Sequence, residues 1–174
     1  ARAIVLGGLA EGVSRITNPL PGVDSFSIVG MMRALGARID TSNPEQWVFE
    51  GVGNRPQAPA CVLDAGNSGT GKSHIAIALL LLGCGQNLRC RYVTAAGMLR
   101  DLLSGLADNS LEQKLKTYLA PELLLIDEVG FDRLEQHDSA HACLFHKVID
   151  GRYCKGSTIL TTNIDFKQLG DYLG

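Results

Sequence analysis

One eight-residue segment, Gly66-Asn67-Ser68-Gly69-Thr70-Gly71-Lys72-Ser73, constrains this chain more than any other feature. It fits the pattern G-x-x-x-x-G-K-[ST] at every fixed position and follows an apolar run at 60–63. Its glycines allow positive φ and a close approach of the backbone to an anion, and successive N–H groups form a concave anion site. Lys72 would reach the β- and γ-phosphates, and the Ser73 hydroxyl would ligate magnesium. The segment predicts a phosphate-binding loop (Walker A) for a nucleoside triphosphate; the alternative is a chance Gly/Ser turn.

Two carboxylates after a second apolar run support this prediction. Leu123-Leu124-Leu125-Ile126 is typical of a strand buried on both faces, and Asp127-Glu128 follow it directly. Ligands of open α/β sheets bind at this carboxyl end of the strands. We expect Asp127 to hold magnesium and Glu128 to orient or deprotonate the attacking water. The alternative is an exposed acid pair at a strand end.

A third apolar segment, 157–162, ends in Asn163. This residue is a candidate for contact with the γ-phosphate or the attacking water. Taken alone the signal is weak, because strands often end in Asn as a turn former.

From about Gly66 to Asp171, these motifs together resemble the IstB/DnaC-like group of AAA+ ATPases, which help transposition or load replicative helicases. The resemblance rests on four stretches: Gly69–His74, Arg91–Ala96, Leu124–Gly130, and Arg152-Tyr153 with Gly156–Asn163. It implies that Lys72 and Ser73 bind phosphate and Mg²⁺, that Asp127 and Glu128 form the Walker B pair, and that Asn163 senses the γ-phosphate. It also implies ATP as ligand, and DNA and a transposase or helicase as partners.

The first seventy residues resemble a different family, 5-enolpyruvylshikimate-3-phosphate (EPSP) synthase. The matching stretches are Arg2–Gly12, Met32–Ala37 and Leu63–Thr70. This resemblance implies that Arg2 contacts shikimate 3-phosphate and that Gly69 lies at the phosphoenolpyruvate site. The family's second domain, with its acid–base residues, has no counterpart in the sequence, so we expect no carboxyvinyl transfer.

Both resemblances include Gly66–Thr70, so we interpret the chain as a chimera joined at a shared anion-binding turn. We expect an EPSP-synthase-like α/β fragment over residues 1–59 and a P-loop ATPase core over residues 60–174. The core is expected to be an AAA+-like three-layer α/β structure with a parallel sheet, incomplete at its C-terminus. The family's fifth strand, arginine finger and second sensor would lie beyond Gly174, and Arg152 is not that finger by its motif position.

Composition and net charge limit the classes of partner that we expect the chain to bind. The net charge is −2 without a basic block, so the sequence lacks the electrostatic footprint of strong DNA binding by a monomer. No apolar stretch is long enough to span a bilayer, and the N-terminus lacks the pattern of a signal peptide. We expect a cytoplasmic protein with free thiols and no membrane partner. A homo-oligomer is a further candidate, because an open sheet edge invites association.

Periodicity and turn residues predict the following elements. Helices are expected at 2–10, 25–35, 72–82, 96–106, 110–118 and 139–150. Strands are expected at 13–17, 38–40, 46–50, 60–65, 89–94, 122–127 and 157–162. The helix at 72–82 is apolar on nearly every side and is therefore predicted to be buried. Ser110-Leu111-Glu112-Gln113 predicts a capping box.

The sequence is therefore compatible with three functions. The first is an ATP-binding module with weak Mg²⁺-dependent ATPase activity, of the transposition-helper type. The second is a fragment of a carboxyvinyltransferase that retains a site for a phosphorylated ligand. The third is a chimera without function. We favour the first.

Overall fold

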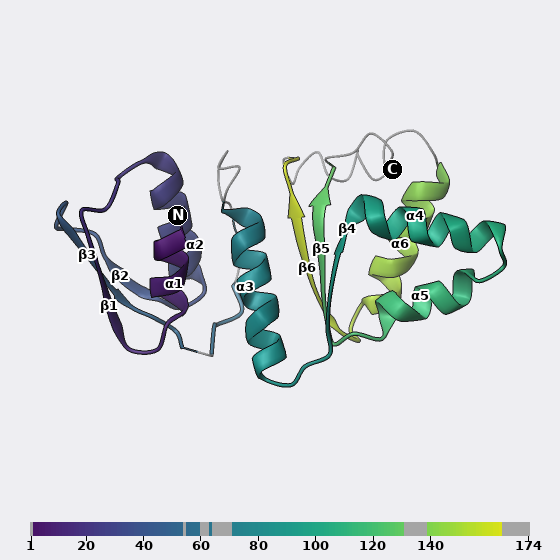
Figure 1. Ribbon diagram of the computed structural model, residues 1–174, viewed down its shortest axis with the longest axis horizontal. Coiled ribbons are helices and arrows are strands. Elements are labelled where there is room, and N and C mark those ends of the chain that lie inside the picture. The colour runs from purple at the N-terminus through teal and green to yellow at the C-terminus, as the bar shows by residue number, and fades with distance from the viewer. Residues whose placement is uncertain (1, 54, 60–62, 64–70, 131–138, 165–174) are drawn as a thin grey trace. The chain divides into compact units, whose positions relative to one another are not determined.

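The structure is a computed structural model that describes residues 2–53, 55–59, 63, 71–130 and 139–164. The chain divides into two compact units, residues 1–75 and 76–174. Figure 1 shows the first unit in purple and blue and most of the second in green to yellow. The helices within the described ranges are all too short or too polar to cross a lipid bilayer.

The first unit is an antiparallel sheet with two helices packed on it. Its elements are α1 (Arg2–Leu9), β1 (Val13–Thr17), α2 (Val23–Ala34), β2 (Arg38–Asp40) and β3 (Gln46–Glu50). The strand order is β1-β3-β2, and the central strand pairs Gln46 with Thr17 and Val48 with Asp40. All five predicted elements are confirmed, although α2 begins two residues earlier than expected.

Alternation along β3 builds the core of this unit. Trp47 and Phe49 are buried and point to the same face, because successive side chains of a strand alternate between faces. The Trp47 ring packs against the Phe26 ring of α2 with centroids 5.3 Å apart, and a Cβ on Gly7 of α1 would lie 3.2 Å from the Phe49 ring. Gly8 lets α1 approach α2 closely: a Cβ at this position would lie 2.8 Å from the Met32 side chain.

The second unit is built on a parallel sheet. Its elements are β4 (Cys90–Thr94), α4 (Ala95–Ala107), α5 (Leu111–Leu119), β5 (Leu123–Val129), α6 (Ser139–Arg152) and β6 (Ser157–Thr162), preceded by α3 (Lys72–Gly85), which begins in the first unit. The described strands are ordered β4-β5-β6, and Leu125 of β5 lies opposite Tyr92 and Ile159. The α/β core with a parallel sheet is confirmed. The strand predicted at 60–65 lies outside the described residues except for Leu63.

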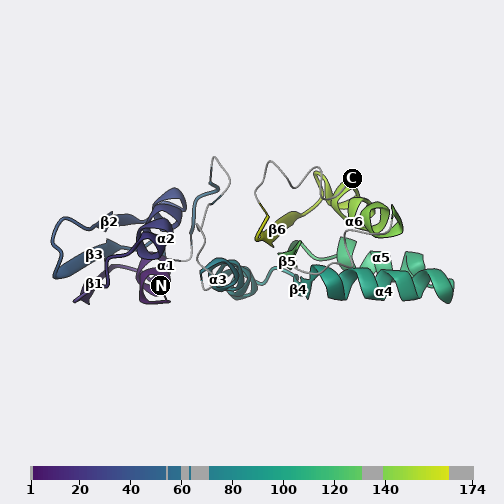
Figure 2. The ribbon, with the colours of Figure 1, turned by 90° about the horizontal axis from the view of Figure 1, so that it is seen from above.

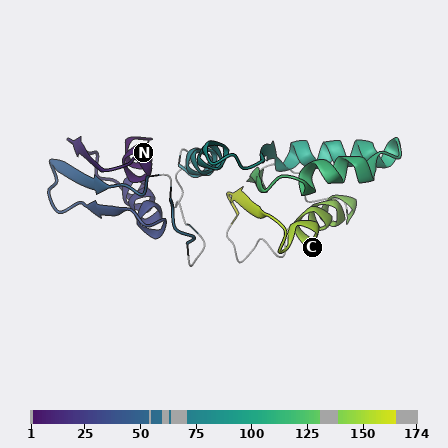
Figure 3. The ribbon, with the colours of Figure 1, turned by 90° about the horizontal axis from the view of Figure 1, so that it is seen from below.

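Helices cover both faces of this sheet, as Figures 2 and 3 show from above and below. On one face, Leu124 and Ile126 pack against α4, α5 and α6 in a large apolar cluster. On the other face, Leu123 and Leu125 pack against Ala76 and Leu80 of α3. Because the four apolar residues of β5 alternate between these two clusters, the strand is buried on both sides.

The prediction that α3 is buried all round is wrong. Its exposed side carries His74, Ile77, Leu81 and Cys84, and Leu81 is 63% exposed. The helix packs on the sheet through Ala76 and Leu80, so one side faces the core and the opposite side faces solvent.

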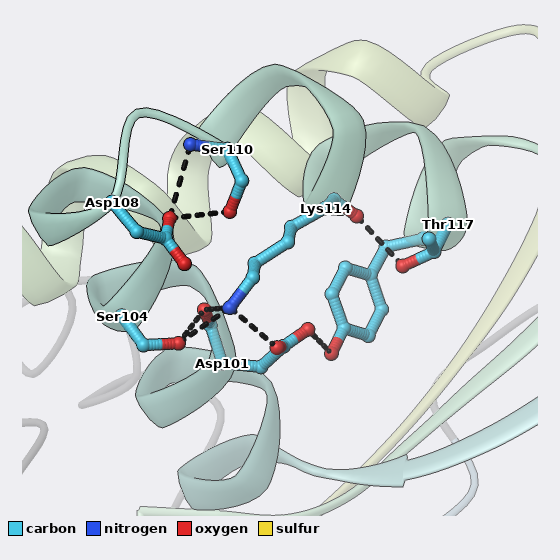
Figure 4. Close-up of polar contacts among 7 residues, drawn as sticks. Asp101, Ser104, Asp108, Ser110, Lys114 and Thr117 are labelled. Atoms are coloured by element: carbon cyan, nitrogen blue, oxygen red, sulfur yellow. Dashed lines mark hydrogen bonds and ion pairs between the residues drawn. The ribbon is translucent and has the colours of Figure 1, made fainter.

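Polar contacts join α4 to α5 at the edge of the larger cluster (Figure 4). Lys114 pairs with Asp101 at 3.2 Å and donates to Ser104 Oγ at 2.6 Å. Tyr118 donates to Asp101 at 2.7 Å, and its ring lies under the Arg91 guanidinium, 4.6 Å from the centroid. The pKa of Asp101 is lowered, first by the Tyr118 hydrogen bond and also by Lys114 and Arg91, whereas burial raises the pKa of Tyr118 to about 12.

The predicted capping box at the start of α5 is wrong. Ser110 is the residue before the helix, but its side chain caps no backbone N–H. Its hydroxyl donates instead to Asp108, which also accepts from the Ser110 N–H at 3.0 Å. Asp108 supplies a local turn contact that competes with the cap.

Candidate functional site

Asp127 is a buried carboxylate at the carboxyl end of β5. Only 3% of its surface is exposed. Oδ1 accepts a hydrogen bond from the Thr161 hydroxyl, and Oδ2 accepts one from the Tyr92 hydroxyl at 3.2 Å. Burying a charged group is costly unless hydrogen bonds compensate. The contacts from Tyr92 of β4 and Thr161 of β6 offset this cost, and they also fix the orientation of the carboxylate.

Glu128 follows with an exposed side chain and a left-handed backbone. Its φ is 62°, a conformation that residues other than glycine rarely adopt. Its N–H donates to Thr161 Oγ1 at 3.0 Å and to Asp127 Oδ1 at 3.1 Å. The pairing register between β5 and β6 shifts at this point, between Ile126 and Val129. Such strain persists where surrounding contacts enforce it, and it concentrates at functional sites.

Thr161 joins the two acidic residues through one hydroxyl. Its side chain donates to Asp127 and accepts from the Glu128 N–H, and the residue is 8% exposed. This role of Thr161 was not predicted from the sequence. The available signal was its place near the end of the strand beside Asp127-Glu128, but the contact depends on the register shift, which no local pattern reveals.

Tyr92 was missed as a site residue for a similar reason. It lies on β4 and contacts Asp127 on the neighbouring strand β5. Its pKa is raised, chiefly by desolvation and then by the negative charge and hydrogen bond of Asp127. The phenol therefore keeps its proton and acts as a donor to the carboxylate.

Lys72 and Ser73 form the first turn of α3. The helix begins at Lys72, and the Ile75 N–H donates to the Gly71 carbonyl at 3.1 Å. Lys72 and Ser73 are half-buried and Gly71 is buried. A helix N-terminus presents free N–H groups and a positive dipole end, which favour an anion. The remaining predicted loop residues, Gly66, Asn67, Ser68, Gly69 and Thr70, lie outside the described residues.

Asn163 directly follows β6 and is exposed. Because β5 and β6 are parallel, their carboxyl ends lie at the same edge of the sheet. The structure therefore brings Asn163 to the edge that carries Asp127 and Glu128. The backbone beyond it is turned by a hydrogen bond from the Ile164 N–H to Thr162 Oγ1 at 3.0 Å.

Arg152 is buried, with 2% of its surface exposed, and its guanidinium is fully engaged in packing. It donates to the carbonyls of Tyr118, Pro121 and Ser157 at 2.7–2.8 Å and to Thr158 Oγ1 at 2.8 Å. Desolvation lowers its pKa from the usual value. These contacts tie the end of α6 to the loop before β5, which accords with its exclusion as a finger residue.

Two further residues were predicted from the resemblance to EPSP synthase, Arg2 as a contact of shikimate 3-phosphate and Gly69 at the phosphoenolpyruvate site. Arg2 is the first residue of α1 and is exposed. Gly69 lies outside the described residues.

Comparison with known families separates the chain into two overlapping parts. The model of the family described as IstB-like ATP binding protein matches residues 57–174. The model of EPSP synthase (3-phosphoshikimate 1-carboxyvinyltransferase) matches residues 1–86, farther than the expected limit near Thr70. The overlap, residues 57–86, contains the whole predicted phosphate loop.

Individual relatives show the same division. The putative ATP-binding protein of insertion sequence IS232 from Bacillus thuringiensis subsp. berliner is 39% identical over 103 residues, covering 59% of this chain and 40% of the relative. That of IS5376 from Geobacillus stearothermophilus is 32% identical over 113 residues, covering 65% and 44%. The 3-phosphoshikimate 1-carboxyvinyltransferase of Ruminiclostridium cellulolyticum is 48% identical over 69 residues, covering 40% and 16%. The chain thus spans less than half of each of these relatives.

Solved structures support the fold. AMPPCP-bound DnaA from Aquifex aeolicus superposes with a TM-score of 0.54 at 20% identity, covering 63% of this chain and 33% of DnaA. A replication initiator DnaA bound to AMPPCP and single-stranded DNA gives 0.51 at 18% identity, covering 63% and 36%. The match over residues 57–174 covers more than half of the sequence, so the chain is a chimera that belongs to the IstB-like ATP binding protein family and carries an EPSP-synthase-like segment ahead of it.

Proposed function

We propose that the chain is a nucleotide-binding module of the transposition-helper type that binds ATP with Mg²⁺. The observation that carries this proposal is the buried Asp127, held by Thr161 and Tyr92 at the carboxyl edge of the parallel sheet. A buried carboxylate beside a strained, exposed Glu128 is costly to maintain. Such an arrangement is typical of a site that handles charge.

The residues fit the ligand by their chemistry. The backbone of Gly66–Ser73 would cradle the phosphates, Lys72 would contact the β- and γ-phosphates, and Ser73 and Asp127 would hold Mg²⁺. Oxygen ligands of this kind suit Mg²⁺, which keeps several waters and takes few protein ligands. When bound, Mg²⁺ would neutralise charge on the β- and γ-phosphates.

We further propose that the chain hydrolyses ATP weakly. Glu128 would accept the proton of the attacking water, and Asn163 at the same edge would contact the γ-phosphate. The hydrogen bonds that the Glu128 N–H donates to Asp127 and Thr161 hold its backbone at this edge of the sheet. An arginine finger contributes about 10³-fold or more in related sites. Since Arg152 is committed to packing, we expect slow turnover.

We place the functional division at residues 1–59 and 60–174, because the predicted strand at 60–65, the loop and α3 would act as one nucleotide-binding element. DNA and a transposase or helicase are proposed as partners of the second part, in the cytoplasm. The proposal rests on membership of the IstB-like family and on relatives that belong to insertion sequences. Because the net charge of the chain is −2, DNA contact would need a homo-oligomer or segments outside this sequence.

Calorimetric titration with ATP and Mg²⁺ tests nucleotide binding. Lys72→Ala should abolish the binding heat, because it removes the cation that contacts the phosphates. Lys116→Ala is a matched control, since it removes an equal charge from an exposed position on α5. Binding by the Lys72→Ala variant at unchanged affinity would contradict the proposed site.

The family match over residues 1–86 favours a second candidate. The first part would bind a phosphorylated ligand, with Arg2 and Gly69 contacting shikimate 3-phosphate and phosphoenolpyruvate, without carboxyvinyl transfer. Titration with shikimate 3-phosphate should then show binding that Arg2→Ala removes and that Arg15→Ala retains. Absence of binding by the unaltered chain would rule this candidate out.

A further inference from the structure

The hydrogen bond from Tyr92 to Asp127 runs diagonally between two neighbouring strands. Thr94 of β4 is in register with Asp127 of β5, and Tyr92 lies two residues before Thr94. Because side chains alternate along a strand, Tyr92 and Asp127 lie on the same face of the sheet. Leu125, on this face, packs against α3, the helix that begins at Lys72. Tyr92 therefore lies on the sheet face that α3 covers.

The two carboxylate oxygens of Asp127 are held in different ways. Oδ1 accepts hydrogen bonds from the Thr161 hydroxyl and from the Glu128 N–H. A carboxylate oxygen has about two lone-pair sites, so these two donors occupy Oδ1. Oδ2 accepts from the Tyr92 hydroxyl at 3.2 Å, which is long for a hydrogen bond between oxygen atoms. Oδ2 is therefore the oxygen that would serve a further ligand, and Tyr92 is the described group that already draws on it.

Thr161 and Tyr92 differ in how readily each would release the carboxylate. Thr161 is buried and its hydroxyl also accepts from the Glu128 N–H at 3.0 Å, so its departure would break two hydrogen bonds. Tyr92 is 48% exposed, and rotation of its side chain toward solvent would break the one hydrogen bond that the structure describes for its hydroxyl. Water would then replace Asp127 as the partner of the hydroxyl, so the net cost of the exchange is small.

We propose that Tyr92 competes with Mg²⁺ for Oδ2 of Asp127 and gives up its hydrogen bond when ATP and Mg²⁺ bind. This inference rests on the proposed function, because it requires nucleotide and metal at this site. The phenol hydrogen and Mg²⁺ both draw on the electrons of the same oxygen, whether the ion meets the carboxylate directly or through one of its waters. The contact from Thr161 is kept throughout and orients the carboxylate. Tyr92 therefore lowers the affinity for the metal.

The sign of the effect separates competition from support. A hydrogen-bond partner that orients a metal ligand strengthens metal binding, and its loss typically lowers the metal affinity by about tenfold to a hundredfold. A competing donor has the opposite effect, because metal binding has to break its hydrogen bond. Since the net contribution of such a hydrogen bond is modest, removing the Tyr92 hydroxyl should strengthen the Mg²⁺-dependent part of ATP binding by about twofold to tenfold.

The test compares ATP dissociation constants, measured with Mg²⁺ and with a chelator in its place, in Tyr92→Phe and in the unaltered chain. The ratio of the two constants is the gain in ATP affinity that depends on Mg²⁺, and this gain should be larger in Tyr92→Phe. Tyr153→Phe is the matched control, because it removes the same hydroxyl from an exposed position directly after α6 and should leave the gain unchanged. An equal or smaller gain in Tyr92→Phe would overturn the proposal.

A second measurement follows Tyr92 in the unaltered chain and so does not depend on the folding of a variant. With tyrosine rings labelled for NMR, the Tyr92 signals should move toward those of a solvent-exposed tyrosine when Mg²⁺ is added to the ATP-bound chain. ATP alone should move them less. Signals that do not respond to Mg²⁺ would overturn the proposal. Absence of ATP binding by the unaltered chain would instead contradict the proposed function, and this inference would fall with it.

Discussion

The two units treat their polar groups differently. In the first unit, the charged pair Arg38–Glu50 lies on the surface at 3.4 Å, with side chains 83% and 58% exposed. In the second, Asp127, Thr161 and Arg152 are buried, and they are the buried polar residues identified within the described ranges. Surface pairs contribute little to stability, whereas buried polar groups need specific partners. The buried polar groups of the second unit have two roles: Asp127 and Thr161 belong to the candidate site, and Arg152 ties the end of α6 to the loop before β5.

The largest expected effect comes from Arg152→Met. The change leaves the carbonyls of Tyr118, Pro121 and Ser157 without the Arg152 donor and should destabilise the second unit by about 3 kcal/mol.

The chain's single tryptophan lies in the first unit and all four tyrosines in the second. Denaturant unfolding followed by tyrosine and by Trp47 fluorescence therefore separates the units. The tyrosine transition should shift alone, and Arg38→Met should cost less than about 1 kcal/mol. Equal losses of stability from Arg152→Met and Arg38→Met would show that the two units do not differ in this way.

Thr161→Val should have the next largest effect. The isosteric change removes the hydroxyl shared by Asp127 and the Glu128 N–H and should cost about 1–3 kcal/mol. It should also weaken ATP binding that depends on Mg²⁺, because Asp127 loses an orienting donor. Thr117→Val is the control, since that hydroxyl contacts a carbonyl at an exposed position. Unfolding midpoints and titration heats that match those of the control would contradict this role for Thr161.

Tyr92→Phe should cost about 1 kcal/mol, because the ring remains and only the hydrogen bond to Asp127 is lost. Changing the other partner, Asp127, tests the same hydrogen bond. Asp127→Asn removes the neighbouring negative charge, so the raised pKa of Tyr92 should move back toward its ordinary value. Ultraviolet absorbance titration of the two chains measures the shift. An unchanged titration would show that the carboxylate does not face this phenol in solution.

Asp101→Asn should have the smallest effect and a defined pH dependence. The pKa of Asp101 is lower in the folded chain than in the unfolded one, so its contribution is present above about pH 4 and is lost as pH falls through the folded pKa. The contribution is below about 1 kcal/mol, because the pair with Lys114 is partly exposed. Stability of the variant should therefore depend less on pH on the acid side. If the free energy of unfolding changes equally with pH in Asp101→Asn and in the unaltered chain, the prediction is contradicted.

Much of the fold could be predicted from the sequence because its signals are local. The run Leu123–Ile126 identifies a buried strand by composition alone, and the alternation of Trp47 and Phe49 identifies a half-buried one. The side on which α3 is exposed could not be predicted in this way, since Ile77 and Leu81 are as apolar as their buried neighbours. Burial there depends on which side meets the sheet.

The candidate site was predictable only in part. Asp127 and Glu128 follow from their place after a strand, and Asn163 from the same rule. Thr161 and Tyr92 contact Asp127 from neighbouring strands, and the Thr161 contact lies beside a register shift between β5 and β6. These are tertiary features. At Ser110, a strong local motif failed because Asp108 offered the hydroxyl a nearer partner.

The most direct test of the central claim is a double-mutant cycle of ATP binding with Lys72→Ala and Asp127→Asn, titrated with and without Mg²⁺. We expect each change to weaken binding and Asp127→Asn to remove only the part that depends on Mg²⁺. The two losses should not be additive, because both residues serve one ligand. Independent, additive losses, or binding unaffected by either change, would show that the loop and the carboxylate do not form one nucleotide site.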